Sequence, residues 1–470
     1  MTAVGAVNDF DLVVVGGGPG GYSTAIRAAQ LGFNTALVEE EALGGVCLNW
    51  GCIPTKALLH AAELVHDIRH AADFGIQARL EGIDLAAMVG HSRRTAERLS
   101  KGVAFLLRKN GITHLEGRGR VAGKGQLSVT AADGSEQTLR VPHIILATGA
   151  SLRRLPGLPV DDERIWDARA AMTATECPQH LVVIGAGAIG IEFASFYHDI
   201  GARVTLVEMT DRVAPTEDHE ISERLRKALV ARGIDCRLST RFAGLDEDGA
   251  GLAVRLEGPD GETDRVVCDR LLVAVGVSGN TRDLGLEAVG AELDGDFLRT
   301  DFRGRTNVAG LYAIGDVAGA PWLAHKAAHE GIACVEHLAG LRSGPGHAPA
   351  IPGCIYARPQ VASIGLSEQA AQAQGLEVRI GRFDLAANGK ALAAGHGEGL
   401  VKTVIDAGTG ELLGAHMIGH GVSEQIQGFA LAMGGELTSA EFTDTVFPHP
   451  TQSEAMHEAV LDADGVAINQ

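Results

Sequence analysis

The sequence predicts an α/β protein that contains two Rossmann-like dinucleotide-binding domains and a C-terminal α+β domain. The first observation behind this fold class is a strand–glycine turn–helix–strand unit that occurs twice, with its turn at 16–21 and again at 185–190. The second is that residues 348–470 alternate short strands and helices without such a turn. A chain of 470 residues is also long enough for about three domains.

The first unit begins with an unbroken apolar run at 10–15, which is typical of a buried parallel strand. Gly16 then forms a tight turn, Gly18 allows a pyrophosphate to approach the backbone, and Gly21 allows the helix to pack on the strand. The next strand ends at Glu39, whose carboxylate can accept a hydrogen bond from a ribose hydroxyl. The sequence therefore predicts a dinucleotide site near the start of the chain.

The second unit repeats this pattern after the apolar strand at 181–184. The turn residues expected to lie against a second dinucleotide are Gly185, Gly187, Ile189 and Gly190. Glu208 ends the following strand, where its carboxylate would repel a 2′-phosphate and accept from a 2′-hydroxyl. This predicts NAD rather than NADP at the second site, although Arg212 lies nearby.

A pair of cysteines, Cys47 and Cys52, lies between the two units. A disulfide requires Cα atoms roughly 4.4–6.8 Å apart, and a regular helix does not bring residues five apart into that range with suitable orientation. A bridge would therefore need a distorted helical turn, which Gly51 permits. The spacing leaves open a redox disulfide and two unrelated buried thiols, and it makes a zinc site less favourable because no second ligand pair is present.

Several other segments complete the predicted organisation. Helical spacing of charged and apolar residues predicts helix over 61–108, and 126–141 is expected to form a small β-meander that turns at Asp133-Gly134. Apolar strands that end in small residues are expected at 144–149, 271–276 and 306–317, with Thr148, Gly149, Gly276 and Asp316 near their ends. Segments rich in Gly and Pro at 155–159 and 344–353 are expected to connect domains.

His449 lies between Pro448 and Pro450, which restrict the backbone on both sides, and Glu454 is the nearest following carboxylate. A His oriented by a carboxylate is a suitable general base near neutral pH. With 18 histidines in the chain, a surface His remains the simpler interpretation from this segment alone.

Composition excludes several classes of function. A net charge of −19 and only 4% aromatic residues oppose binding to nucleic acid and to anionic membranes. Seven cysteines in so long a chain do not form a secreted disulfide framework. Residues 1–10 do not have the pattern of a signal or transit peptide, and no apolar run is long enough to cross a membrane, so we expect a cytoplasmic protein without a metal centre.

Together, the motifs resemble the pyridine nucleotide–disulfide oxidoreductases over essentially the whole chain. The matching segments are GGY at 20–22, IRAAQLG at 26–32, CLNWGCIPTK at 47–56, LAHKA at 323–327 and HPTQSEA at 449–455. They are most similar to those members of the family that oxidise dihydrolipoamide. One departure is Val277-Ser278-Gly279, which stands where the family often has an Arg-containing turn.

The resemblance implies FAD at the first unit and NAD at the second. The residues it implies for FAD are Gly16, Gly18, Gly21, Glu39, Lys56, Thr148, Gly149, Asp316 and Ala324. The residues it implies for NAD are Gly185, Gly187, Ile189, Gly190, Glu192, Glu208 and Gly276. Lys56 and Glu192 match the family's ion pair beside the flavin. The implied domains are residues 1–150 and 277–347 for FAD, 151–276 for NAD, and 348–470 for the subunit interface.

The resemblance also implies the catalytic groups. Cys47 and Cys52 would form a redox disulfide, with Cys47 exchanging with substrate and Cys52 facing the flavin, although spacing alone would allow the reverse. His449 and Glu454 would serve as an acid–base pair for the other subunit of an obligate homodimer, and His449-Pro450 matches a cis bond of the family.

The expected reaction is oxidation of a dihydrolipoyl group, carried on a protein, with NAD as acceptor. One alternative keeps the fold and reduces another disulfide with NAD(P)H. A second alternative is a non-catalytic flavoprotein, which would not need the retained cysteines, Lys56, His449 and Glu454.

Overall fold

The computed structural model describes residues 9–158, 160–248, 251–341 and 350–470. The predicted connection at 344–353 lies mostly outside these residues, as do Pro159 and most of the segment 1–10. The chain divides into two compact units. Unit 1 consists of Met1–Ala57, Ala87–Arg153 and Gly276–Ala348, and unit 2 consists of Leu58–Ala86, Arg154–Val275 and Pro349–Gln470.

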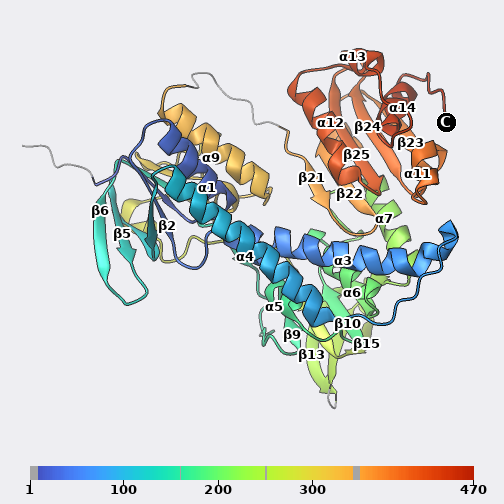
Figure 1. The fold of residues 1–470 in the computed structure, drawn as a ribbon, viewed down its shortest axis with the longest axis horizontal. Coiled ribbons are helices and arrows are strands. Elements are labelled where there is room, and N and C mark those ends of the chain that lie inside the picture. Colours follow the sequence, from blue (N-terminus) through green and yellow to red (C-terminus); the bar gives the residue numbers. More distant parts are fainter. Residues whose placement is uncertain (1–8, 159, 249–250, 342–349) are drawn as a thin grey trace, which may run out of the picture. The chain divides into compact units, whose positions relative to one another are not determined.

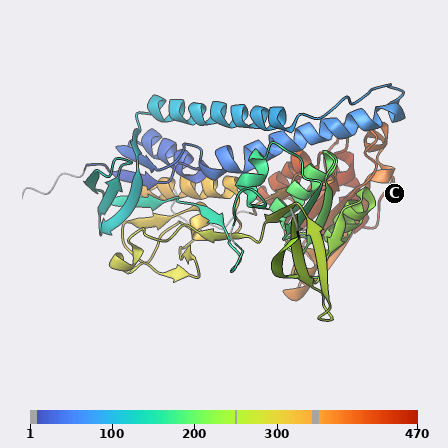
Figure 2. The same ribbon diagram turned by 90° about the horizontal axis from the view of Figure 1, so that it is seen from below.

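Unit 1 is built on a five-stranded parallel sheet, as expected for the first nucleotide-binding fold (Figure 1). Its strands, in spatial order, are β20 (Leu311–Ala313), β7 (His143–Leu146), β1 (Leu12–Val15), β2 (Thr35–Glu39) and β3 (Thr113–Glu116). Helices α1 (Pro19–Gln30), α9 (Ala324–Leu338) and α4 (Leu85–Lys109) share a hydrophobic core with one face of this sheet. In Figure 2, α4 runs along the outside of unit 1, so that one of its sides is left uncovered.

The other face of this sheet packs against the predicted meander. This is a three-stranded sheet of β4 (Arg118–Gly123), β5 (Gln126–Thr130) and β6 (Glu136–Arg140). The smaller elements of unit 1 are α2 (Gly45–Trp50), β8 (Ala150–Leu152), β17 (Val277–Gly279), α8 (Leu286–Val289), β18 (Leu293–Asp294), β19 (Phe297–Leu298) and the short helix η2 (Gly315–Ala318).

The continuous helix predicted over 61–108 is wrong in one respect. The structure has two helices there, α3 (Cys52–His70) and α4, separated by the short helix η1 (Ala71–Phe74) and an irregular segment that ends before Leu85. Gly75 follows η1 with a φ of +77°, a left-handed conformation that commonly ends a helix.

Unit 2 contains a second five-stranded parallel sheet, which confirms the repeated nucleotide-binding fold. Its strands, in spatial order, are β12 (Asp235–Arg237), β11 (Arg203–Val207), β10 (His180–Ile184), β16 (Arg270–Val273) and β9 (Ile165–Trp166). The helices α5 (Ala168–Thr173), α6 (Ala188–Asp199) and α7 (His219–Arg232) accompany it, with an antiparallel sheet of β13 (Arg241–Asp248), β14 (Gly251–Glu257) and β15 (Thr263–Cys268).

The C-terminal part of unit 2 is the expected α+β fold. An antiparallel sheet has the order β21 (Gly353–Ile355), β22 (Gln360–Gly365), β25 (Leu412–Gly419), β24 (Leu400–Asp406) and β23 (Val378–Asp384). Its helices are α10 (Glu368–Ala373), η3 (Leu385–Ala387), α11 (Gly389–Ala393), α12 (Val422–Gly434), α13 (Ser439–Asp444) and α14 (Glu454–Ala463). α12 and α14 contribute to one core with β22–β25.

Candidate active and cofactor sites

The residues predicted to hold the first dinucleotide follow neighbouring strands of the unit 1 sheet. Asp316 comes after β20, Thr148 after β7, the glycine turn after β1, and Glu39 ends β2. Because parallel strands present their carboxyl ends at the same edge, the sheet brings these residues together along one edge. Residues that are about 300 positions apart in sequence thus line one candidate site.

The two glycine turns have nearly the same geometry. Gly16 and Gly185 have φ of +107° and +103°, and a Cβ at either would lie 2.2–2.3 Å from a carbonyl oxygen of the strand beside it. A Cβ at Gly21 or Gly190 would lie 1.8–1.9 Å from the oxygen of the turn's first glycine. Each of these four positions therefore requires glycine.

Glycine serves a different purpose at the middle position of each turn. A Cβ at Gly187 would meet no atom within 4 Å, and one at Gly18 would meet only a Cα at 3.9 Å. The space beside these two glycines is open, and each directly precedes the first turn of a helix, α1 or α6. Backbone N–H groups and the helix dipole favour a phosphate there, so both turns fit a dinucleotide pyrophosphate.

Glu39 and Glu208 hold the turns from their own strand ends. Glu39 accepts a hydrogen bond from Gly17 N at 2.6 Å through Oε2, and Glu208 accepts one from Ala186 N at 2.8 Å. The other oxygen of each carboxylate accepts from the backbone two residues further on. Each carboxylate also accepts a third bond, Glu39 from Ala42 N and Glu208 from Thr210 Oγ1. Since a carboxylate can accept about four hydrogen bonds, each retains capacity for one ribose hydroxyl.

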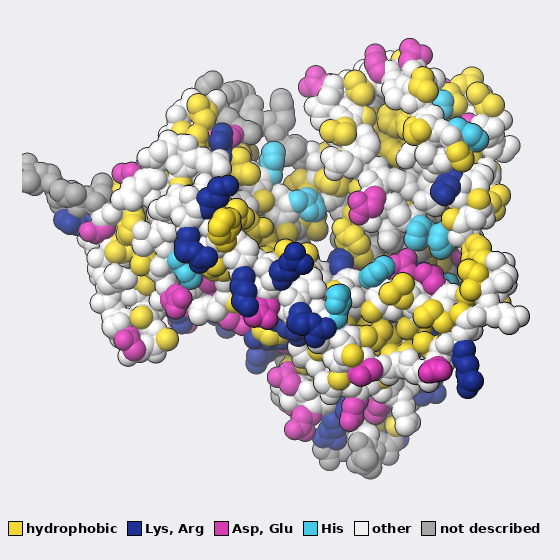
Figure 3. Space-filling view, in the orientation of Figure 1, with side chains coloured by type: hydrophobic (Ala, Val, Ile, Leu, Met, Phe, Trp, Pro, Cys, Tyr) yellow, Lys and Arg dark blue, Asp and Glu magenta, His cyan; other side chains and the backbone are white. Residues whose placement is uncertain are grey.

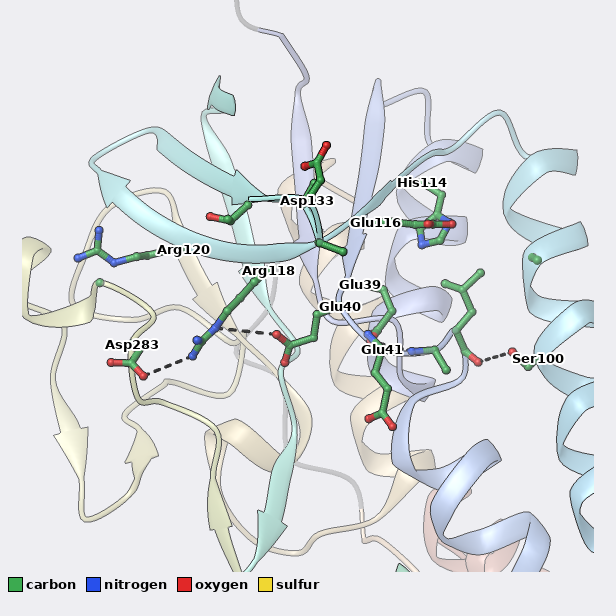
Figure 4. A pocket seen from close by; sticks show the side chains of 18 of the residues that line it. Glu39, Glu40, Glu41, Ser100, His114, Glu116, Arg118, Arg120, Asp133 and Asp283 are labelled. Carbon is green, nitrogen blue, oxygen red and sulfur yellow. Dashed lines mark hydrogen bonds and ion pairs between the residues drawn. The ribbon is translucent and has the colours of Figure 1, made fainter. Parts of the chain in front are cut away.

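A cavity of about 1240 Å³ in unit 1 lies beside Glu39 (Figure 4). It is bounded by the end of β2, by α4 through Ser100, by β3 through His114 and by the start of β4. Arg118 reaches toward Glu40 and Asp283 at the cavity, at 3.9 and 3.5 Å. Of the cofactor-binding and catalytic residues predicted from sequence, only Glu39 is among the residues that line this cavity. Most of the other predicted FAD contacts of unit 1 belong to the glycine turn and to other strand ends.

Two further residues of unit 1 support predicted site residues, and sequence reasoning did not assign them a role. Asn280 donates through Nδ2 to Thr148 O at 2.8 Å, and its own backbone oxygen accepts from Thr148 Oγ1 at 2.9 Å. Glu330 of α9 accepts from Gly315 N at 2.8 Å. The pKa of Asp316 is raised, mainly because the carboxyl group is buried, with Glu330 adding to the effect. The only sequence signal was the Asn in the unusual turn after Gly276.

The cysteine pair is a disulfide whose Cα atoms lie 4.7 Å apart. Cys47 is in α2 and Cys52 begins α3, and the two helices are separated at Gly51. A Cβ at Gly51 would lie 3.1 Å from Val46 O and 3.5 Å from Cys47 Cα, which is tight. Gly51 therefore provides the close approach that lets residues five apart form the bridge.

The segment between the cysteines is anchored to α4. The Arg93 guanidinium donates to Asn49 O and stands 4.0 Å from the ring centroid of Trp50. Trp50 Nε1 donates to Glu41 Oε1 at 3.1 Å. One cation–π contact and two hydrogen bonds thus hold the C-terminus of α2, and they restrict the backbone that leads into Cys52.

His449 is in unit 2, just before α14. Its Nδ1 lies 2.9 Å from Glu454 Oε1, and the His449-Pro450 bond is cis. Thr451 N donates to Glu454 Oε2 at 2.9 Å, and this bond, together with the one to His449, holds the pKa of Glu454 below its usual value. The imidazole side chain is 79% exposed. The structure thus pairs the two predicted residues and leaves the other ring nitrogen accessible.

The remaining predicted residues lie in both units. Ala324 is the first residue of α9, and Lys56 is in the second turn of α3. Glu192 is buried in α6, where it accepts from Tyr356 N at 3.0 Å. Gly276 follows β16, and Ile189 is in the first turn of α6. In the unit 2 sheet, the ends of β10 and β11 are adjacent, so that the second glycine turn and Glu208 share one edge.

Family comparison agrees with this arrangement. Residues 10–331 match the family described as pyridine nucleotide-disulphide oxidoreductase, and residues 351–460 match the dimerisation domain of the same family. The chain belongs to the pyridine nucleotide-disulphide oxidoreductases. The expected family, the fold class and the dimerisation domain are therefore confirmed.

Relatives extend over almost the whole chain. A dihydrolipoyl dehydrogenase from Zymomonas mobilis is 48% identical, with 98% of this chain and 99% of the relative aligned. One from Rhizobium etli is 47% identical over 98% and 99%. The crystal structure of LpdA from Mycobacterium tuberculosis has a TM-score of 0.88 and 30% identity, covering 96% of this chain and 98% of that one.

Members of this family use FAD and NAD, and the two turns described above fit one dinucleotide each. Among the described residues, no cluster of three or more His, Cys, Asp or Glu side chains is suited to hold a metal ion. The helices within the described ranges include none with both the length and the apolar composition needed to cross a bilayer.

Proposed function

We propose that this protein is a dihydrolipoyl dehydrogenase, which oxidises a protein-bound dihydrolipoyl group to its cyclic disulfide with NAD as the final acceptor. The observation that carries the proposal is the Cys47–Cys52 disulfide, which follows the first strand–turn–helix–strand unit in a chain up to 48% identical to dihydrolipoyl dehydrogenases. FAD, when bound, supplies the two-electron step between dithiol and NAD that amino-acid side chains do not provide.

The proposed cofactor contacts follow the two sheet edges. FAD would be held by Gly16, Gly18, Gly21, Glu39, Lys56, Thr148, Gly149, Asp316 and Ala324, and NAD by Gly185, Gly187, Ile189, Gly190, Glu192, Glu208 and Gly276. Support comes from the open space at the middle glycines and from the acceptor capacity left on the two strand-end glutamates. The proposed domain limits remain 1–150, 151–276, 277–347 and 348–470.

Disulfide exchange is the step that the chain's own residues perform. A substrate thiolate attacks the sulfur of Cys47, the Cys47–Cys52 bond breaks, and Cys52 leaves as a thiolate. The second substrate thiol then attacks the mixed disulfide at its substrate sulfur, which releases the cyclic lipoyl disulfide and a reduced Cys47. The balance is one substrate dithiol oxidised, one enzyme disulfide reduced, and two protons released from the substrate.

We assign the first of these protons to His449. Thiolate exchange needs a deprotonated nucleophile, and the exposed nitrogen of His449 can accept a thiol proton while Nδ1 stays bound to Glu454. The low pKa of Glu454 keeps its carboxylate charged, so it stabilises the imidazolium that forms. We propose that this pair serves the disulfide of the other subunit of a homodimer, in line with the dimerisation domain at 351–460.

The test compares Cys47→Ser, Cys52→Ser and His449→Gln in the purified flavoprotein. Each cysteine variant should lose measurable dihydrolipoamide oxidation and retain its FAD absorbance, and His449→Gln should lose about 10²–10⁴-fold in turnover. His457→Gln is the control, because that ring is bonded through Nε2 to Thr443 O and has no proposed role. Normal turnover in either cysteine variant would refute the proposal.

The alternative function is reduction of another disulfide with NADH, and comparing the turnover of the two kinds of substrate distinguishes it from the proposed function. We expect dihydrolipoamide with NAD to be the preferred pair over a panel of oxidised low-molecular-weight disulfides with NADH. We propose a cytoplasmic location on the basis of the bacterial relatives.

A further inference from the structure

One side of α4 carries a row of exposed cations. We call Arg94, Arg98, Lys101, Arg108 and Lys109 the basic ridge. At about 100° per residue, these five positions fall within roughly 100° around the helix axis, opposite the buried Ala96, Val103 and Leu107. The ridge is about 22 Å long, and Figure 3 shows Lys and Arg side chains gathered along this helix.

The charge of the basic ridge is mostly left without a local counter-charge. Within the described part of the chain, only Lys101 of the five forms an ion pair, with Glu97. Elsewhere in unit 1, Arg27 forms an ion pair with Glu336 and Arg305 forms one with Asp301. In a protein of net charge −19, this row is a local reversal of sign. Such a surface attracts an acidic partner and raises the rate of encounter.

The opposite and adjacent sides of α4 hold the redox segment. Arg93 donates to Asn49 O, and Ser100 Oγ donates to Leu43 O at 2.8 Å, one residue before the glycines that lead to Cys47. A partner seated on the basic ridge would therefore lie on the helix that anchors the segment between the two cysteines. This continuity favours a substrate-bearing partner over an unrelated one.

We propose that the basic ridge is the docking surface for the acidic face of the lipoyl-bearing domain, an inference that rests on the proposed function. The ridge is charged, with Phe105 exposed at 57% among its cations and Leu99 and Leu106 also exposed on α4. A mainly charged surface with few apolar side chains suits a partner that binds and leaves at each turnover. A second copy of this chain is a weaker candidate, because the family's dimerisation domain is at 351–460.

The experiment measures kcat/KM for two substrates of the holoenzyme. One is free dihydrolipoamide, and the other is a reduced, lipoylated domain of a 2-oxo acid dehydrogenase acyltransferase with negative net charge. Arg98→Glu is compared with Lys124→Glu, since both side chains are exposed in unit 1 and neither forms an ion pair with a described residue. The control thus has the same charge change away from the ridge.

We expect Arg98→Glu to lower kcat/KM for the lipoyl domain about 10-fold at low ionic strength, through KM, and to leave free dihydrolipoamide within twofold of wild type. Adding Arg94→Glu should deepen the loss. At about 0.5 M salt the difference should shrink, because the Debye length falls to roughly 4 Å.

Several outcomes would overturn the inference. These are an equal loss in Lys124→Glu, an equal loss with free dihydrolipoamide, or no loss at all. Dissociation of the oligomer by Arg98→Glu, seen by analytical ultracentrifugation, would instead make the ridge an interface between copies. If wild-type protein oxidises neither substrate, the proposed function fails first, and that result is distinct from a failure of the ridge alone.

Discussion

Lys402 is a buried cation surrounded by carboxylates, and its removal should strongly destabilise unit 2. The side chain is 1% exposed on β24. Its Nζ lies 2.9 Å from Asp218 Oδ1, 2.7 Å from Glu368 Oε2 and 3.3 Å from Glu220 Oε2. The cluster joins the loop before α7, in the nucleotide-binding part of unit 2, to the C-terminal sheet.

Lys402→Met keeps most of the side-chain volume and removes the ammonium. Asp218, whose side chain is 0% exposed, then remains charged without its cation. It also caps α7 by accepting from Glu220 N at 3.0 Å, so it cannot turn toward water without loss of that bond. Removing one partner of a buried ion pair costs about 3–5 kcal/mol. At roughly 2–4 °C per kcal/mol, the unfolding midpoint should fall by roughly 6–20 °C.

The assay is differential scanning calorimetry of the holoenzyme, with Lys390→Met as the control, because Lys390 is exposed on α11 and forms no ion pair with a described residue. The double variant Lys402→Met with Asp218→Asn should recover most of the loss, since Asn keeps an acceptor for the α7 cap and removes the stranded charge. A midpoint for Lys402→Met within about 2 °C of wild type would refute the reasoning. So would a double variant that is no more stable than the single one.

The same cluster gives a pH dependence with a defined sign. Burial alone would raise the pKa of Asp218, but the hydrogen bond and charge of Lys402 outweigh it and lower this pKa. The stabilisation is therefore present above the unfolded carboxyl pKa of about 3.9 and is lost as pH falls through the lower folded value. For Lys402, burial is outweighed by Glu368 and Asp218, and its pKa is raised. The stabilisation from Lys402 is present below the unfolded lysine pKa of about 10.4 and is lost as pH rises through the higher folded value. The difference in stability between wild type and Lys402→Met should therefore be greatest at intermediate pH.

Three further outcomes are expected. Gly21→Ala places a Cβ 1.8 Å from Gly16 O, so the purified protein should retain little FAD by absorbance, and normal flavin content would contradict the packing argument. Glu208→Ala removes the acceptor that holds the second turn, so the KM for NAD should rise about 10-fold while FAD content stays unchanged; an unchanged KM would count against the assigned edge. Burial raises the pKa of Cys268 and Cys334 to about 12, so at pH 8 only ~10⁻⁴ of each thiol is ionised. Iodoacetamide should therefore alkylate the reduced Cys47 and Cys52 but not Cys268 or Cys334, as measured by peptide mass spectrometry.

The sequence was informative where chemistry depends on local backbone geometry. The two glycine turns could be predicted because each requirement, a positive φ, a close helix contact or an open space, restricts one residue within a strand–turn–helix unit. Because the strands of each sheet are parallel, their carboxyl ends were expected at the same edge of the sheet. Strand ends at 149 and 316 could therefore be expected beside the first turn, although no short-range signal joins them.

Contacts between distant polar residues could not be predicted in the same way. Lys402 and Asp218 are 184 residues apart, and a Lys in a strand normally indicates a solvent-facing position. Asn280 supports Thr148 across 132 residues, and nothing in either segment specifies the other. The break between α3 and α4 was missed because the charged and apolar residues of 71–84 keep a helical spacing, which conceals the left-handed Gly75.

The form of the His449–Glu454 pair bears on why the proposed active site needs a second subunit. A catalytic His that serves its own unit would gain from burial, yet this imidazole is 79% exposed. Its orientation is nevertheless fixed within unit 2, since Glu454 binds Nδ1 and is itself held by Thr451 N. A side chain that is ordered in advance loses little conformational entropy when another surface covers it. An exposed, oriented base is what a site completed by dimerisation requires, and the burial that strengthens its bond to Glu454 would then be supplied by the partner.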